Sequence, residues 1–585
     1  MPLFLNTRPR RPITGKLAVL LAGCLLLAGC GRAPSSGSAA TIQPKPNSQR
    51  RTVAYDQMEI GEANGPELAQ KLRDLAGQVD GMESLDQLLE AEEALNSELE
   101  VFSTSSSLAQ LESYLHSSDE NARQRSQEFS VQGEEVSQAV SDYLRAVMDS
   151  HLAEAYRADA GTYVAAQMDK QLASSDPAAL EPLQRRAELD SEYNQLLSNL
   201  RVEVNGEERR MEEVLNDPDI SMEDFYTAIG DYYLGNYQQF ADIYLEMIAL
   251  DKQAAAACGY DDAAQWRYDW YGRDYTPDDA REMFKEIKTW VVPLLAENAS
   301  SSAMSQSLSL EEGVDAVETL LADTDSRLAE GWNFLTEYGL YSLEPAPDKQ
   351  SGIGFTTSLA AYDAPFIYTY WGDTLDDAFT LIHEFGHAMD DYTQFGNEAY
   401  STDLDKCETF SQGLEQVLRD RLANQLGADA EGVRVAMQSN MLQVITYQAA
   451  LEEFQLEAYE LDENADAEDL GSLYSQVLAE YGYYTIFGEM DPSWFEITHL
   501  FDSPFYTVSY VTSATAALEL GRMEDEEEGA GLEAWLQLLR TDRNQSFESF
   551  LQSAGIASPF EKGRIRECAE FLESQLSGGG MEYAA

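Results

Sequence analysis

Histidine and basic residues are both scarce in this sequence. Its 585 residues include only five histidines, and 38 lysines and arginines stand against 104 aspartates and glutamates, a formal net charge of −66 at pH 7. Such an excess of negative charge repels the phosphate backbone of nucleic acids and the surface of anionic membranes. We therefore expect no nucleic acid partner, and contact with a membrane only through an attached lipid anchor.

Cysteine is as rare as histidine, with five residues in the whole sequence. Beyond Cys24 and Cys30, the three that remain are far apart: Cys258, Cys407 and Cys568. An odd number of distant cysteines does not indicate a disulfide framework. We expect Cys407 to be a small buried residue rather than a metal ligand.

The N-terminus has the composition of a targeting segment. Several basic residues precede the apolar run 17–28, which is too short to span a membrane as a permanent helix. The run ends in Leu27-Ala28-Gly29-Cys30, which resembles a bacterial lipobox. We predict a lipoprotein signal peptide over residues 1–29, lipidation at Cys30 and a flexible tether over residues 30–53, which place the protein outside the cytoplasm on the cell membrane. An ordinary secretory signal is the alternative.

Two of the five histidines lie in one short motif, His383-Glu384-Phe385-Gly386-His387. In a helix, His383 and His387 project one turn apart on the same face, so both imidazoles can reach one metal ion. Glu384 leaves that face at another angle and can act as a general base on water. The alternative is a surface helix with two unrelated histidines. Gly386 in the middle of the helix indicates the close approach of another backbone or a ligand, or ordinary helix packing.

The sequence around this motif favours a buried helix. Thr374 and Asp377 form a variant of a capping box at its start. An apolar stripe then follows at helical spacing: Leu375, Ala378, Phe379, Ile382 and Met389.

A catalytic zinc ion needs a third protein ligand and an open position. The next histidine after His387 is His499, so the third ligand should be a carboxylate. The best candidate is Glu408, in a second helical segment, and Glu415 lies two turns further on the same face. Glu415 can orient a ligating imidazole, or it can be a solvated acid. The weaker candidates for the third ligand are Glu398, Asp403 and Asp405.

These segments together resemble the catalytic core of oligoendopeptidase F, in the thimet oligopeptidase family of zinc peptidases. The resemblance is carried by Gly354–Ser358, Gly372–Leu375, Thr380–Ala388, Glu408–Glu415 and His499–Tyr510. It implies one Zn²⁺ per chain, held by His383, His387 and Glu408. It also implies that His499, Tyr506 and Tyr510 line the substrate side of the metal, with a tyrosine hydroxyl as the main donor to the oxyanion. Which tyrosine takes that role stays open.

The rest of the chain predicts a mainly α protein. Apolar residues recur at helical spacing through residues 54–350, and Val202–Glu207 is the best hairpin signal. We expect two helical lobes around a deep substrate cleft, with an N-terminal helical region at 54–350 and a catalytic region at 351–585. The segment Gly352–Ser358 is expected to be extended. It can pair with a substrate as an edge strand or pack under the metal helix.

Three functions fit this sequence. The favoured hypothesis is a membrane-tethered zinc endopeptidase that acts on short oligopeptides, with water activated by the metal and Glu384 as the general base. A metallocarboxypeptidase of similar helical fold is the second, and it would need a cationic group for the substrate C-terminus. The third is a non-catalytic peptide-binding lipoprotein, which has no need of a general base.

Overall fold

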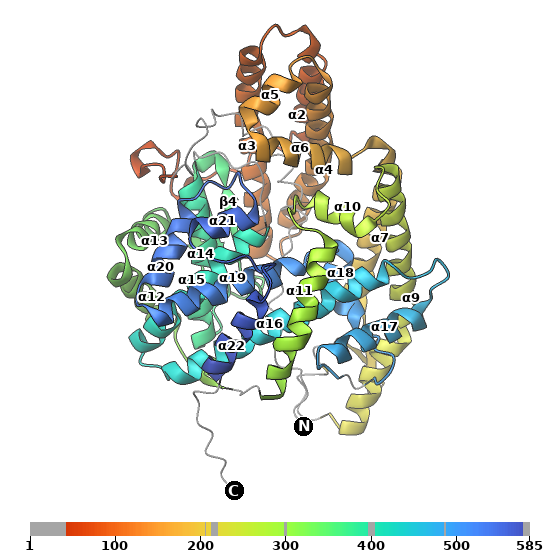
Figure 1. Ribbon diagram of the computed structural model, residues 1–585, viewed down its shortest axis with the longest axis vertical. Helices are drawn as coiled ribbons and strands as arrows, with labels where there is room; N and C mark the ends of the chain where they lie inside the picture. Colours follow the sequence, from red (N-terminus) through yellow and green to blue (C-terminus); the bar gives the residue numbers. More distant parts are fainter. Residues whose placement is uncertain are drawn as a thin grey trace. The chain divides into compact units, whose positions relative to one another are not determined.

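The computed structural model describes residues 42–576, apart from residue 205 and residues 212–213, 215–219, 298–300, 396–403 and 485–486. Helices dominate the described chain, and the strands in it form two small sheets (Figure 1). The predicted mainly α class is confirmed.

The chain divides into two compact units. The first unit comprises the residues up to Leu172, then Glu297–Leu442, and the residues from Thr512 on; the second comprises Ala173–Ala296 and Gln443–Val511. The helices of the first unit are η2 (Asn47–Gln49), η3 (Tyr55–Gln57), α2 (Gly65–Ala76), η4 (Val79–Gly81), α3 (Leu85–Leu115), α4 (Glu120–Asp149), α5 (Ala153–Ala160), η7 (Ala303–Ser305), α12 (Leu310–Thr324), α13 (Ser326–Tyr338), η8 (Ala360–Tyr362), α14 (Leu375–Gln394), α15 (Leu404–Gln425), α20 (Ala530–Leu539), α21 (Phe547–Ser553) and α22 (Arg564–Leu576). The helices of the second unit are η5 (Pro177–Ala179), α7 (Leu180–Asn199), α9 (Met222–Ala257), α10 (Ala263–Trp270), α11 (Pro277–Trp290), α17 (Ala467–Glu480), η9 (Ser493–Glu496) and α18 (Thr498–Asp502). The boundaries of the units fall within α6 (Thr162–Ser174), η6 (Val292–Glu297), α16 (Ala430–Ala458) and α19 (Val508–Glu526).

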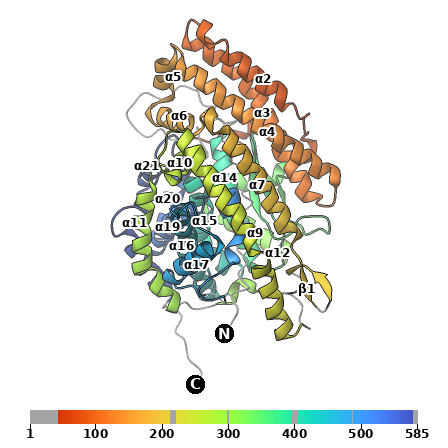
Figure 2. The same ribbon diagram turned by 90° about the vertical axis from the view of Figure 1, so that its right-hand side faces the viewer.

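Helices α2, α3 and α4 form a layer of their own in the first unit, and they lie side by side in both views (Figures 1 and 2). Apolar residues at helical spacing on α2 and α4 are buried between the three helices: Leu68, Leu72, Leu75, Val136, Val140, Tyr143 and Val147. Ser84 accepts a hydrogen bond from the backbone N–H of Gln87 at the start of α3, and Asp119 accepts one from Asn121 at the start of α4. The helical spacing of the buried residues matches the inner faces of α2 and α4.

The larger sheet lies in the first unit and has the strand order β3-β5-β4. Strand β5 (Ala364–Tyr368) is central and entirely buried, with β3 (Tyr341–Ser342) parallel on one side and β4 (Phe355–Leu359) antiparallel on the other. The predicted extended segment therefore begins its strand at Phe355, at an edge of the sheet.

Strand β4 packs between two helices. The Phe355 ring lies 5.4 Å from the ring of Tyr114 in α3, whereas Thr356 contacts Glu384 in α14. Alternate side chains of a strand face opposite sides of the sheet. The alternation therefore determines which residues of β4 contact α14 and which contact α3. The two roles predicted for this segment are compatible, because the strand packs against α14 and is also an edge strand.

The second unit is built around helices α7 and α9, which lie side by side in both views (Figures 1 and 2). The predicted hairpin is present as β1 (Val202–Val204) and β2 (Glu207–Arg209), with Gly206 at a positive φ of 83° in the turn. The core holds a fully buried carboxylate, Asp251, between Arg186 and Arg267. Burial alone would raise the pKa of Asp251, but the two guanidinium groups outweigh it and lower the pKa.

Residues 42–53 pack against the rest of the first unit. Arg50 donates to the backbone oxygens of Asp363 and Tyr392, and its guanidinium lies 4.0 Å from the centre of the Tyr392 ring. Lys45 and Arg51 both form ion pairs with the Asp363 carboxylate. The prediction of a tether is therefore wrong for these contacting residues, and residues 30–41 of the predicted tether lie outside the described part of the chain.

The predicted signal peptide and Cys30 also lie outside the described residues. Among the described helices, none combines the length and the apolar character needed to cross a membrane. The deep substrate cleft and the boundary between residues 350 and 351 stay predictions.

Asp363 offers a test of the contact between the N-terminal segment and the sheet. It is buried and has a left-handed backbone with φ of 49°, which asparagine also tolerates. Burial alone would raise the pKa of Asp363, but hydrogen bonds from Arg51 and Lys45 outweigh it and hold the pKa below its ordinary value. The carboxylate thus stabilises the fold above its unfolded-state pKa of about 3.9, and this stability is lost as the pH falls through the lower folded-state pKa.

We expect Asp363→Asn to lower the free energy of unfolding by about 1–3 kcal/mol at pH 7, because it removes charge-assisted hydrogen bonds. At pH 3 the difference from the wild type should shrink. Urea unfolding of both proteins at the two pH values measures this. An equal difference at both pH values would show that the charge of Asp363 is not the source.

Candidate metal centre

Helix α14 carries both histidines of the motif. It begins as the sequence predicts, since the backbone N–H and the hydroxyl of Thr374 both donate to Asp377 Oδ2 at 2.8 Å. The predicted stripe is buried along its whole length: Leu375, Ala378, Phe379, Ile382 and Met389. This burial fixes the rotation of the helix and leaves His383 and His387 on one face, with ring centres 5.1 Å apart.

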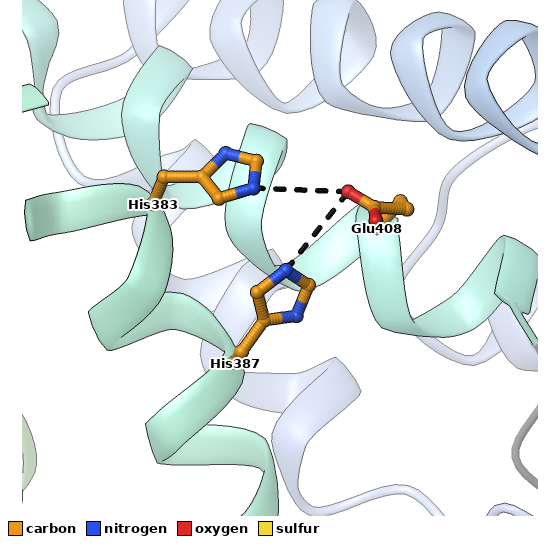
Figure 3. A group of neighbouring side chains, drawn as sticks. All are labelled: His383, His387 and Glu408. Carbon is orange, nitrogen blue, oxygen red and sulfur yellow. Dashed lines mark ion pairs between the residues drawn. The ribbon is translucent and has the colours of Figure 1, made fainter. Parts of the chain in front are cut away.

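Helix α15 brings Glu408 to these histidines. Glu408 Oε2 lies 3.8 Å from His383 Nε2 and 3.9 Å from His387 Nε2 (Figure 3). These separations are too long for hydrogen bonds, but they are close to the distance of about 3.3–3.5 Å between ligands of a tetrahedral zinc ion. The Ser411 hydroxyl donates to the same Oε2 at 3.2 Å. One donor atom from each of the three residues can therefore face a single cation.

Of the weaker candidates for the third ligand, the structure describes only Asp405, and Asp405 does not belong to the group of His383, His387 and Glu408. Asp405 is buried and accepts a hydrogen bond from the Thr512 hydroxyl at 2.6 Å. Glu398 and Asp403 lie outside the described residues.

Gly386 is the point where α14 and α15 touch. A Cβ atom there would lie 2.7 Å from both Phe410 O and Ser411 Cα. The Phe410 carbonyl is itself fixed, because Trp535 Nε1 donates to it at 2.9 Å. Of the explanations that the sequence allows for this glycine, the close approach of another backbone is the one observed.

Glu415 lies against the first histidine. Its Oε1 is 2.5 Å from His383 Nδ1, and its side chain is only 16% exposed. Nδ1–H donating to this carboxylate leaves Nε2 directed at the metal position. Glu415 is therefore placed to orient the imidazole, and it is not a solvated acid.

The charges in this cluster favour a cation. Burial alone would lower the pKa of His383, but the hydrogen bond and charge of Glu415 outweigh it, with smaller effects of Glu384 and Glu408, and raise the pKa to about 9. Burial, and then the charge of His383, lower the pKa of His387 to about 3. Burial also raises the pKa of Glu408. Two imidazoles and a carboxylate suit Zn²⁺, and such a donor set fits the predicted ion.

Glu384 is almost completely buried, with 4% of its surface exposed. Its carboxylate lies toward β4, where the Thr356 hydroxyl donates to Oε2 at 2.9 Å. Thr356 belongs to the predicted extended segment Gly352–Ser358, but the sequence does not mark it as a site residue. The signal that could have found it is the alternation along β4, which puts every second side chain on the side of α14.

The other three predicted site residues lie together in the second unit. The ring of Tyr506 lies 5.5 Å from that of His499 and 5.2 Å from that of Tyr510. Burial lowers the pKa of His499 to about 4, so this imidazole is neutral at pH 7. The cluster of three is thus a feature of the structure, and its role on the substrate side of the metal stays a prediction.

Comparisons with known proteins bear on both ends of the chain. A model described as Peptidase family M3 matches residues 333–570, and a model described as Peptidase M3 N-terminal domain matches residues 55–175. A model described as Carboxypeptidase Taq (M32) metallopeptidase matches residues 233–413. The first match contains His383, His387, Glu408 and the cluster around His499.

Two curated relatives are oligoendopeptidases F. The plasmid enzyme of Lactococcus lactis subsp. cremoris is 27% identical over 290 residues, 47% of this chain and 45% of the relative. A homologue from Borreliella burgdorferi is 28% identical over 188 residues, 30% of this chain and 32% of the relative. The chain thus matches about half or less of the length of these relatives.

Solved structures share the fold. PZ peptidase A, in complex with an inhibitor, superposes with a TM-score of 0.76 at 21% identity, over 89% of this chain and 99% of that one. At this identity the likeness concerns the fold alone.

The contact at Gly386 can be tested with a matched pair of glycines. We expect Gly386→Ala to lower the unfolding midpoint, and also to weaken the affinity for zinc by about tenfold or more, because the new methyl group would push α14 and α15 apart. Gly133 is the control: it also lies inside a helix, α4, and nothing lies within 4 Å of a Cβ built there.

Gly133→Ala should leave zinc binding unchanged and should not destabilise the protein, since alanine favours a helix more than glycine does. Thermal unfolding and zinc titration of the metal-free proteins measure both effects. A Gly386→Ala protein with the stability and zinc affinity of the wild type would show that the close approach of the helices is not required.

Proposed function

The chain belongs to peptidase family M3, and from this we propose that it is a zinc-dependent endopeptidase that hydrolyses short oligopeptides. The observation that carries the proposal is the convergence of His383, His387 and Glu408 from two buried helices, next to the buried carboxylate of Glu384. A metal site with an adjacent general base is what hydrolysis of a peptide bond by water requires.

His383, His387 and Glu408 would hold one zinc ion per chain. When bound, zinc lowers the pKa of a coordinated water toward neutrality and polarises a carbonyl group. The protein's part is to aim the Nε2 atoms of both imidazoles at one point. Glu415 does this for His383 by accepting the proton of Nδ1–H.

Glu384 would move the proton. It follows His383 directly in α14, and its charge contributes to the raised pKa of that imidazole. As a carboxylate it accepts a proton from the attacking water, and it then delivers that proton to the amine of the leaving peptide. Its burial keeps bulk water from competing for this proton.

His499, Tyr506 and Tyr510 would stabilise the developing oxyanion. A neutral imidazole and a tyrosine hydroxyl are both hydrogen-bond donors, and the lowered pKa of His499 keeps it in the neutral form. Within the described chain, the buried His499 Nε2 has no hydrogen-bond partner, which is consistent with a partner in the substrate. Losing such a donor should cost on the order of 10²–10³ in kcat.

The substrates would be oligopeptides that pair with the outer edge of β4. Lipidation at Cys30 would hold the enzyme on the outer face of the membrane, and no other contact with lipid is required. The relatives named oligoendopeptidase F support the choice of short peptides.

Two other functions compete with this proposal. The match of residues 233–413 to the M32 carboxypeptidase model favours a metallocarboxypeptidase as the second candidate. A non-catalytic peptide-binding lipoprotein is less favoured, because a buried Glu384 has no task in a protein that only binds.

Two variants separate catalysis from metal binding. We expect Glu384→Gln to keep one zinc ion and to lose kcat by about 10²–10⁴-fold, because the amide cannot accept the proton. Glu408→Ala should instead lose zinc, since it removes a ligand. Metal analysis and cleavage of quenched fluorescent peptides measure both effects. Unchanged turnover of Glu384→Gln would refute the general-base role, and a fully loaded Glu408→Ala would show that another acid is the ligand.

The choice between endopeptidase and carboxypeptidase rests on the substrate C-terminus. We expect a peptide and its C-terminally amidated form to be cleaved at the same internal bond with similar kcat/KM, because an endopeptidase makes no essential contact with the terminal carboxylate. Mass spectrometry of the products identifies the bond. Loss of cleavage on amidation, with single residues released from the free acid, would favour the carboxypeptidase.

A further inference from the structure

A single threonine hydroxyl in β4 contacts both the backbone and the side chain of Glu384. Thr356 Oγ1 lies 2.9 Å from Glu384 Oε2 and 2.9 Å from Glu384 O. The carboxylate is 4% exposed, so few contacts with water compete with this hydrogen bond. A hydrogen bond to a buried charged group is stronger than one at the surface, and it fixes the direction of the group.

The fold determines where this hydroxyl points. Thr356 stands opposite Ile367 in the antiparallel register of β4 and β5, and β5 is buried throughout. The next residue, Thr357, faces the other side of the sheet, where its hydroxyl donates to Ser107 in α3 at 3.2 Å. A rotation of the strand about its axis is therefore resisted on both faces, and the Thr356 hydroxyl stays aimed at α14.

A second residue of the same segment accommodates the other carboxylate oxygen. A Cβ atom at Gly354 would lie 3.3 Å from Glu384 Oε1, with Thr380 and Thr369 close behind. Thr356 and Gly354 thus lie beside different oxygens of one carboxylate. The segment from Gly354 to Thr356 therefore forms the binding surface for the side chain of Glu384.

We propose that Thr356 is a positioning residue for the general base, and that its hydroxyl holds the Glu384 carboxylate in the orientation in which it accepts a proton from water. This inference rests on the proposed peptidase function. Without the hydroxyl, the carboxylate would lose one defined hydrogen bond in a site with little access to water, and its orientation would spread over several rotamers.

A purely structural role is the alternative, because the same hydroxyl also reaches the Glu384 carbonyl and could simply join β4 to α14. The two roles differ in what a substitution changes. If the role is structural, the substitution changes the stability of the protein and the KM for a substrate bound at β4. If the role is positioning, the substitution lowers kcat, and it does so only when residue 384 carries a carboxylate.

The test uses three variants of the zinc-loaded protein. We expect Thr356→Val, which keeps the shape but removes the hydroxyl, to lower kcat by about 10- to 100-fold with KM and zinc content unchanged. Thr356→Ser should restore kcat to within about threefold of the wild type. Thr357→Val is the matched control, because it removes a hydroxyl from the adjacent residue on the opposite face. Since the same strand is the proposed substrate-binding edge, an effect of Thr357→Val should appear mainly in KM, and its kcat should fall by less than about threefold.

A double-mutant comparison links the effect to Glu384. In a Glu384→Gln protein, Thr356→Val should lower the residual kcat by less than about twofold, because there is no carboxylate to orient. The wild type, the two single variants and the double variant should also be unfolded in urea without metal. Their unfolding midpoints should shift non-additively, since the two side chains contact each other in the absence of zinc.

The outcomes separate this inference from the proposed function. Wild-type turnover that Glu384→Gln abolishes and Thr356→Val leaves intact would overturn the positioning role alone. An equal loss in Thr356→Val and Thr357→Val, or a change in KM instead of kcat, would show a structural role of the strand. Additive unfolding midpoints would also count against the hydrogen bond. A wild type that cleaves no peptide would overturn the proposed function, and the positioning role with it.

Discussion

The backbone contact between α14 and α15 at Gly386 sets the geometry of the candidate site. It lies next to His387 on one helix, and on the other it falls at Phe410 and Ser411, between Glu408 and Glu415. The contact therefore brings His383 next to Glu415 and His387 close to Glu408. A methyl group at this point would force a separation of roughly 1 Å, whereas zinc–ligand distances tolerate only about 0.2 Å. The remaining parts of the site depend on this close approach.

Electrostatics adds to this geometric constraint. Glu408, Glu415 and Glu384 are gathered around two partly buried imidazoles, and all three carboxylates raise the pKa of His383. The raised pKa of His383 is a consequence of these negative charges, because a proton on that ring neutralises part of them. A divalent cation would do so more completely, and it would leave both imidazoles in the neutral form that ligation requires. The large negative charge of the chain also favours solubility and disfavours anionic partners.

Much of this site could be predicted from the sequence because it depends on helix periodicity. The spacing of His383 and His387, the capping residues of α14 and the position of Glu415 two turns after Glu408 all follow from 3.6 residues per turn. The contact of the Glu384 carboxylate with Thr356 could not be predicted in this way. Thr356 meets Glu384 across 28 positions, and its direction depends on a strand register that local sequence does not specify.

The boundaries of the two compact units could not be read from the sequence. The unit boundaries fall within α6, η6, α16 and α19, so no change in composition or linker marks them. The N-terminal residues 42–53 read as a tether because they end the segment 31–53, which is rich in serine, proline, alanine and glutamine. In the structure they contact the first unit through Arg50 and through the ion pairs of Lys45 and Arg51 with Asp363, partners more than 300 residues away. Such contacts are decided by the tertiary fold.

The most direct test of the metal site is zinc K-edge X-ray absorption on protein loaded with one equivalent of zinc. Ligation by His383, His387 and Glu408 predicts a nearest shell of nitrogen and oxygen only, at about 2.0–2.1 Å, with the outer scattering of two imidazole rings. A sulfur neighbour at about 2.3 Å, as ligation by Cys407 would produce, or scattering from fewer than two imidazoles, would contradict the account.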